Sequence, residues 1–290
     1  MLAKKITVII FFIICCTGYF FFINTSPVQQ IKVNLQWHEN ILGCKSTFDP
    51  KNSGEAWFIE QLQFFLSDIE IEVEGQGWQH LQLTKNAFQN SNTVLLGTNC
   101  REKKQHSQKN DAEYWSIIFE NNVDISKVRS VKFTVGVPFD VNHLNPVSQQ
   151  SPLNLPSMFW VWQTGHKFIR AEFASVDDQW IFHLGSSGCK AASVMRPPKQ
   201  KCLYPNTFEF ELPVDELDSK ALILNFNLAH LLHNVEMSSK ANCQSERDNE
   251  SCLQLFNNLA TYNKPLSVQH KYGTFSTKRA INDVKGSEVE

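Results

Sequence analysis

The stretch Ile31-Lys-Val-Asn-Leu-Gln-Trp37 alternates apolar and polar residues at every step. Because successive side chains of a strand point to opposite faces of a sheet, this pattern predicts a strand with one buried face. Similar alternation is found in Ile69-Glu-Ile-Glu-Val73, Val131-Lys-Phe-Thr-Val135, Phe208-Glu-Phe-Glu-Leu212 and Leu222-Ile-Leu-Asn-Phe-Asn-Leu228. We predict further strands over 58–66, 114–119, 159–163, 167–173 and 180–183. Many short strands with few helical stretches indicate an all-β protein, an antiparallel β-sandwich or open barrel with long loops. A short helix is expected near the C-terminus, over 251–259.

The two ends of the chain differ from the rest. Lys4 and Lys5 precede an apolar run over 6–23, so residues 1–27 are interpreted as a signal peptide or an N-terminal membrane anchor. No small-x-small cleavage site follows the run, and both interpretations stay open. The protein is therefore expected in the periplasm, either free or tethered to the inner membrane by residues 6–23. Residues 28–272 are expected to form a single β domain, and the polar tail 273–290 is expected to be disordered.

Charge and cysteine content narrow the class of protein. The net charge is -2, with 27 Lys and Arg against 29 Asp and Glu, so no basic excess argues for nucleic acid. Six cysteines follow the N-terminal segment, an even set that indicates disulfides in an exported chain. Short loops favour two of the possible pairs and leave a third, namely Cys189 with Cys202, Cys243 with Cys252, and Cys44 with Cys100. A thiolate metal site is the alternative, but the sequence has no Cys-x-x-Cys motif.

Candidate chemistry begins with the histidines. The sequence has no Gly-x-Ser-x-Gly, no His-Glu-x-x-His, no phosphate-binding glycine loop and no dinucleotide fingerprint, so we do not expect an enzyme. His38 and His183 each end an alternating strand, and His143 lies in a Pro-rich loop over 138–156. Imidazole is a common metal ligand, which makes a metal site the better-supported hypothesis. For each histidine, a structural hydrogen-bonding role is the competing interpretation.

Two tryptophans, Trp160 and Trp162, lie one residue apart in Ser157-Met-Phe-Trp-Val-Trp-Gln-Thr-Gly165. In a strand, both indoles would point to the same face of the sheet. Taken alone, this pattern predicts a pair of packed core aromatics.

The motifs taken together resemble a known family. They are Phe64-Phe-Leu-Ser-Asp-Ile69, Gly136-Val-Pro, Asn142-His143, Pro152-Leu-Asn154, Met158-x-Trp160-x-Trp162-Gln-x-Gly165-x-Lys-Phe168, His183-Leu-Gly-Ser-x-Gly-Cys189, Cys202-x-x-Pro-Asn206 and the late Cys243 and Cys252. In this order they resemble the MbnP family of exported copper-binding proteins. The resemblance implies a partner, a diheme cytochrome of the MbnH type related to MauG. In the family this partner converts the first tryptophan of the pair to kynurenine, and the modified protein then holds one Cu(I) ion.

Transferred to this chain, the resemblance implies that Trp160 is the modified residue. It implies His38 and His183 as the imidazole ligands beside Trp160, with His143 in reserve. Trp162 is expected to pack against the site or to carry an electron hole toward the heme partner. Asp68 and Asn154 are expected to hydrogen-bond residues of the site. A different hypothesis remains, a secreted β-sandwich that binds a glycan or a protein through exposed aromatic side chains, with structural histidines.

Overall fold

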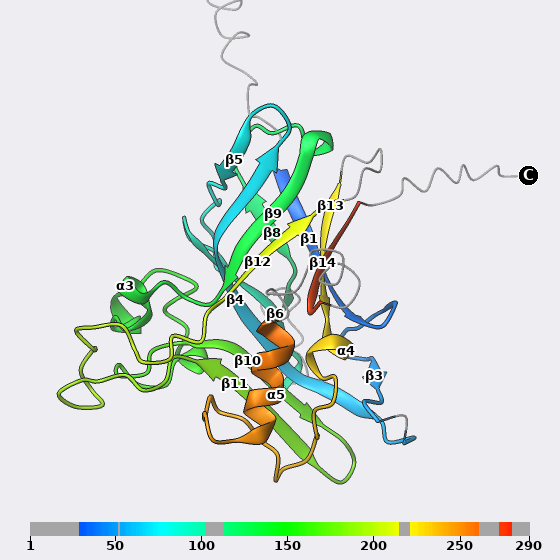
Figure 1. Cartoon of the computed structure of the whole chain (residues 1–290), viewed down its shortest axis with the longest axis vertical. Helices are drawn as coiled ribbons and strands as arrows, with labels where there is room; N and C mark the ends of the chain where they lie inside the picture. Colours follow the sequence, from blue (N-terminus) through cyan, green and yellow to red (C-terminus); the bar gives the residue numbers. More distant parts are fainter. Residues whose placement is uncertain (1–28, 52, 102–112, 215–220, 261–272, 280–290) are drawn as a thin grey trace, which may run out of the picture.

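The computed structural model describes residues 29–51, 53–101, 113–214, 221–260 and 273–279 (Figure 1). The predicted signal peptide or anchor, residues 1–27, lies outside these residues. Within the described residues, no helix has both the length and the apolar character needed to cross a membrane.

The described strands form two sheets. The first has the order β14 (Phe275–Arg279), β13 (Leu222–Asn227), β1 (Gln29–Trp37) and β2 (Asn40–Ile41), and β8 (Ser116–Phe119) also pairs with β1. The second has the order β11 (Gln179–Gly185), β10 (Lys167–Ala174), β4 (Trp57–Val73), β6 (Thr93–Asn99) and β7 (Glu113–Tyr114). The long strand β4 also pairs with β3 (Thr47–Phe48), β5 (Gly77–His80) and β9 (Val128–Val135), and β9 pairs with β12 (Phe208–Pro213).

This architecture confirms the predicted all-β class. Among the described strands, every pair is antiparallel except β1 with β13, which run parallel. The alternation in both strands buries one face of each, but alternation alone does not fix strand direction.

The core between the sheets is a cluster of phenylalanine rings. Phe64 on β4 stacks on Phe226 of β13 with ring centroids 4.8 Å apart. Phe275 on β14 contacts Phe226 and Phe210 at 4.9 Å each and Phe133 at 5.2 Å. Burying each ring contributes roughly 1.5–3 kcal/mol. These contacts join the two sheets into one hydrophobic core.

The prediction of a disordered tail from residue 273 is wrong for its first part. β14 pairs antiparallel with β13, and Phe275 and Thr277 are buried. The sequence Phe-Ser-Thr-Lys-Arg has only one large apolar residue, so its composition does not indicate a strand. The segment pairs through its backbone hydrogen bonds. Residues 280–290 lie outside the described residues.

Helices in the described part of the chain are few and short. α5 (Glu250–Leu259) confirms the predicted C-terminal helix, and the side chain of Asn249 caps it by accepting from the backbone N–H of Cys252. α3 (Phe139–Asn142) and α4 (Leu228–Leu231) are single turns. The described residues also contain three 3₁₀ turns, at Ile125–Lys127, Pro146–Ser148 and Pro156–Met158.

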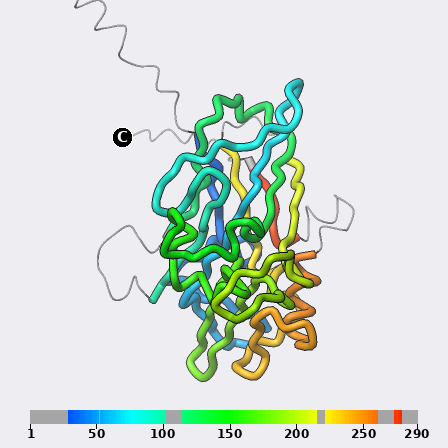
Figure 2. The backbone as a smooth tube through the Cα atoms, turned by 90° about the vertical axis from the view of Figure 1, so that its left-hand side faces the viewer, coloured from blue at the N-terminus to red at the C-terminus, as the bar shows by residue number. Residues whose placement is uncertain are grey.

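The three predicted disulfides are confirmed. Cys44 pairs with Cys100, Cys189 with Cys202, and Cys243 with Cys252. The second closes the loop between β11 and β12, which lies beside the segment that contains α3 (Figure 1). Figure 2 views the molecule from the left-hand side of Figure 1, and there these green and yellow-green loops lie in front of the sheets.

Candidate metal centre

The segment that carries Trp160 and Trp162 is a turn, and the predicted strand over 159–163 is wrong. The backbone N–H of Gly165 donates to the carbonyl of Val161 at 2.7 Å, which closes the turn. Gly165 has φ +78°, and a Cβ atom there would lie 2.6 Å from the side-chain oxygen of Asn142. Only glycine fits this position without strain. The two indoles therefore do not share one face of a sheet, and each is half-buried.

Trp160 packs over the end of β11. Its ring centroid lies 6.3 Å from that of His183, with the planes inclined at 55°. A Cβ atom on Gly185 would lie 2.5 Å from Cζ3 of Trp160, so the absence of a side chain at Gly185 makes room for the indole. The structure therefore brings together two of the predicted site residues, Trp160 and His183.

His183 has one ring nitrogen bonded and the other without a partner. Nε2 lies 3.0 Å from Oε1 of Glu172. Nδ1 is buried and has no hydrogen-bond partner among the described residues. The residue is only 7% exposed, so an unpaired polar atom there carries a cost of about 1–3 kcal/mol. A ligand at Nδ1 would remove that cost.

Glu172 lies at the centre of a charged cluster on β10. It accepts from Nε of Arg170 at 2.5 Å and from Nη1 of Arg101 at 2.6 Å, in addition to His183. Burial alone would raise the pKa of Glu172, but the hydrogen bonds from His183 and Arg170 and the positive charge of Arg170 outweigh it and lower the pKa to about 2. Glu172 is therefore a carboxylate at neutral pH, and Arg101 also forms an ion pair with Glu60.

The protonation of His183 follows from its surroundings. Burial lowers the pKa of His183 more than the hydrogen bond to Glu172 raises it, so the ring is neutral at neutral pH. A neutral imidazole carries one N–H, and the carboxylate of Glu172 accepts only. We therefore assign the proton to Nε2, which leaves the lone pair on Nδ1. A carboxylate that orients an imidazole in this way is a common partner of metal-binding histidines.

The surroundings of His183 are also cationic. Burial and the charge of Arg170 lower the pKa of Lys167 to about 8, and its Nζ donates to the carbonyl of Ser157 at 3.1 Å. Arg170 donates to the same carbonyl at 3.0 Å. Lys167 and Arg170 therefore place positive charge near His183, which the carboxylate of Glu172 partly offsets.

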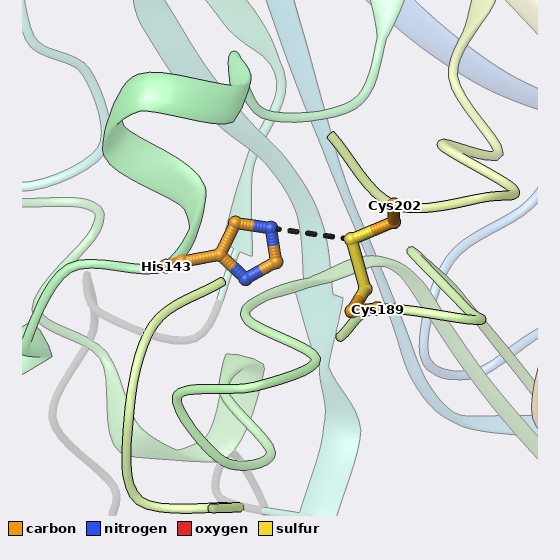
Figure 3. Close-up of side chains that lie close together, drawn as sticks. All are labelled: His143, Cys189 and Cys202. Atoms are coloured by element: carbon orange, nitrogen blue, oxygen red, sulfur yellow. Dashed lines mark hydrogen bonds between the residues drawn. A yellow bond between two sulfur atoms is a disulfide. The ribbon is translucent and has the colours of Figure 1, made fainter. Parts of the chain in front are cut away.

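His143 lies in a different environment, beside the disulfide Cys189–Cys202 (Figure 3). Its Nδ1 lies 3.1 Å from the carbonyl of Trp162, and its Nε2 lies 3.2 Å from the amide nitrogen of Asn142 and 3.6 Å from Sγ of Cys202. Both ring nitrogens therefore have partners. Potential ligand atoms of His143, Cys189 and Cys202 lie within 4.8 Å of one another, but both sulfurs are in the disulfide and offer no thiolate.

His38 is not brought to Trp160 or His183. It is exposed, has φ +52°, and its ring lies 5.2 Å from that of Trp37. The Trp37 ring contacts the ring of Phe48, and Phe48 in turn contacts Phe173 on β10, with centroid distances of 5.0 and 5.3 Å. Phe173 and its neighbour Glu172 point to opposite faces of the sheet. His38 therefore lies on the Phe173 side, in a surface cleft with Asp49 and His233, while His183 lies on the Glu172 side.

The remaining predicted site residues, Asp68 and Asn154, lie at the surface. Asp68 is exposed in a bulge of β4 and accepts from the amide of Asn92 at 3.0 Å. Asn154 is exposed and accepts from the hydroxyl of Ser151 at 3.2 Å. Neither side chain has a recorded hydrogen bond to Trp160 or His183 within the described part of the chain.

Exposed aromatic faces of the kind that stack on sugars are largely covered. Trp78 and Tyr204 are the large aromatic residues that count as exposed among the described residues, at 39% and 38%. Lys132 lies over the Trp78 ring at 4.7 Å, and Arg247 lies over the Tyr204 ring at 4.6 Å. In each of these two exposed residues, a cation therefore lies over one face of the ring that a sugar would stack on.

Sequence reasoning missed the charged cluster of Glu172, Arg170 and Arg101. A signal was present, because Arg170 and Glu172 are charged residues at alternate positions of the otherwise apolar strand Phe168-Ile-Arg-Ala-Glu-Phe173. Charges on the inner part of a sheet require partners, and such partners mark a candidate site.

Comparison with known proteins agrees with the resemblance found in the sequence. A search among curated proteins returns no match. The structure is similar to that of MbnP from Methylosinus trichosporium, with a TM-score of 0.69, 20% sequence identity, and coverage of 88% of this chain and 100% of that one. At this level of identity the likeness establishes a shared fold. The family model MbnP matches residues 25–245. The protein therefore belongs to the MbnP family.

Proposed function

We propose that this protein is an exported copper-binding protein that takes part in copper homeostasis and is not itself an enzyme. Its site would hold Cu(I) between Nδ1 of His183 and an oxidised form of Trp160. The observation that carries the proposal is the unpartnered, buried Nδ1 of His183 beside the Trp160 ring. Membership of the MbnP family and the copper function implied by the sequence motifs support it.

The unmodified site is half-complete. The indole nitrogen of tryptophan is a donor only and offers no lone pair in the ring plane, so Trp160 cannot serve as it stands. Oxidation to kynurenine cleaves the C2–C3 bond of the indole and adds oxygen to both carbons. Hydrolysis then releases C2 as formate and leaves a ketone and an aniline nitrogen. The packed aromatic residue thereby gains atoms that can bind a metal.

The partner supplies the oxidising power for this step. We propose a diheme cytochrome of the MbnH type, which reduces two molecules of hydrogen peroxide to water and so takes up the four electrons removed from Trp160 when both indole carbons gain oxygen. Within this chain, Glu172 holds the His183 ring, and Gly185 leaves room for the changed side chain. When bound, copper supplies a redox-active ion.

The experiment is co-expression of the full chain with an MbnH-type cytochrome in a periplasm, followed by intact-mass analysis and copper determination. We expect the Trp160 peptide to lose one carbon and gain one oxygen, and copper to accompany the modified protein. H183A should lose the copper and keep the mass change, whereas H80A, at an exposed histidine, should keep both. Unmodified Trp160 and absent copper in the wild-type protein would refute the proposal.

A further inference from the structure

A strongly basic loop borders the Trp160 turn. We call residues 186–207, between β11 and β12, the basic loop. It contains no Asp or Glu in a chain whose net charge is -2. Its four cationic residues, Lys190, Arg196, Lys199 and Lys201, are all exposed. Within the part of the chain that the structure describes, none of the four has a recorded ion pair. The charge of the loop is therefore directed at solvent.

The basic loop also exposes apolar side chains. Val194, Met195 and Leu203 are 54%, 57% and 69% exposed. A surface groove of about 810 Å³ runs along the loop, with Lys190 and Arg196 among its lining residues. Exposed apolar side chains among charged residues are typical of protein interaction sites. Solubility alone would require the charges but not the exposed apolar groups.

The basic loop is held in place and joined to the tryptophan turn. The disulfide Cys189–Cys202 closes its base. The backbone N–H of Gln163 donates to the carbonyl of Val194 at 3.1 Å, and the side-chain amide of Gln163 donates to the carbonyl of Cys189 at 3.1 Å. A surface that is ordered before binding loses less conformational entropy when a partner docks. Gln163 directly follows Trp162, so a protein seated on this loop lies against the turn that carries Trp160.

We propose that the basic loop is the docking surface for an acidic face of the redox protein that oxidises Trp160. The inference rests on the proposed function, because it names the place where the oxidising partner binds. Charge complementarity carries it: four exposed cations without a recorded ion pair, on a loop that also exposes apolar side chains, match a partner with a carboxylate-rich face. Such pairs associate quickly at low salt and more slowly as salt screens the charges.

The test compares two variants with the same change in net charge. K190E/R196E/K199E/K201E reverses the basic loop, and K45E/K51E/K85E/K127E reverses four exposed lysines outside it. The probe is a purified MbnH-type diheme cytochrome with hydrogen peroxide. The initial rate of Trp160 modification is followed by intact mass at several salt concentrations. Circular dichroism and the count of free thiols check that each full-length variant is folded.

We expect the basic-loop variant to lose about 10- to 100-fold in rate at low salt and to lose the salt dependence, whereas the control stays near wild type. K190R/R196K/K199R/K201R, which keeps every charge, should keep the rate. Equal rates for the basic-loop variant and the control would overturn the docking proposal. The docking proposal would also be overturned if the basic-loop variant kept the wild-type modification rate but lost binding to phosphatidylglycerol vesicles.

Direct binding separates this inference from the proposed function. Calorimetric titration of the cytochrome into each protein measures docking without oxidant. Binding that depends on the basic loop, with Trp160 still unmodified after peroxide is added, would support docking and contradict the copper proposal. No binding to the wild-type protein would overturn docking whatever the fate of Trp160.

Discussion

Oε1 of Glu172 lies 3.0 Å from Nε2 of His183, and this contact determines which nitrogen of the imidazole is left for a ligand. The two residues come from adjacent strands, β10 and β11, so the sheet itself fixes their spacing. The backbone N–H of His183 donates to the carbonyl of Cys243 at 2.9 Å, which holds the other edge of β11. The position of the free Nδ1 is therefore built into the sheet and does not depend on a mobile loop.

E172Q tests this arrangement. The amide keeps the size of the side chain but loses the charge that holds the proton on Nε2 of His183. We expect the Cu(I) affinity of the modified protein to fall about 10- to 100-fold, as for other residues that orient metal-binding histidines. Competition with a chromophoric Cu(I) chelator measures the affinity, and ¹⁵N NMR of the imidazole reports the tautomer. E209Q, at an exposed glutamate on β12, is the control. Unchanged affinity and tautomer in E172Q would contradict the assignment.

G185A tests the close approach of Trp160 to β11. The added methyl group would lie 2.5 Å from Cζ3 of Trp160 and 2.7 Å from the backbone oxygen of His166, and the backbone oxygen cannot turn aside. We expect the free energy of unfolding to fall by about 1–3 kcal/mol, the usual cost of overpacking. Urea denaturation followed by tryptophan fluorescence measures it. G43A is the matched control, since a Cβ atom on Gly43 meets nothing within 4 Å. Equal stability of the two variants would show that Trp160 packs elsewhere.

Stability should also depend on pH through the buried histidines. Burial lowers the pKa of His166 and of His143 below the ordinary value of 6.5. Each is neutral in the folded protein and binds a proton more readily once unfolded, so its contribution is intact above pH 6.5. As the pH falls below 6.5 toward the folded pKa, protonation favours the unfolded state and stability declines.

Urea unfolding at pH 7.5, 6.5 and 5.5 measures this loss. H166Q should make the free energy of unfolding depend less on pH, and H80A, at an exposed histidine, should leave that pH dependence unchanged. Glu172 affects stability in a separate, lower pH range because its pKa is lowered to about 2. Its contribution is present above pH 4.5 and is lost as the pH falls toward 2. A stability that is constant between pH 7.5 and 5.5 would contradict the histidine prediction.

The sequence predicted the sheet content, the C-terminal helix and two disulfides from local periodicity and short loops, and the third disulfide, Cys44–Cys100, as the pair that remained. It could not place Trp160, because the turn at Gly165 depends on a contact with Asn142, which is distant in sequence. It also could not separate His38 from His183. Both end alternating strands, but the register of β10 and β11 is needed to place His183, and the ring contacts from Trp37 to Phe173 are needed to place His38. β14 was missed because its pairing comes from backbone bonds and one buried phenylalanine.

Comparison of H183A with H38A tests which histidine binds copper. The resemblance to MbnP proteins implies both, whereas the structure places His38 on the opposite side of the sheet, exposed beside Trp37. We expect H183A to reduce copper to background in protein whose Trp160 is modified, because it removes the free Nδ1. H38A should keep the wild-type copper content and affinity, as should the surface control H80A. Copper analysis and chelator competition on mass-verified protein provide the measurement. Loss of copper in H38A as complete as in H183A would contradict this prediction. It would mean that His38 reaches the copper site in the modified protein, although Phe48 and Phe173 pack between the two sides in the unmodified structure.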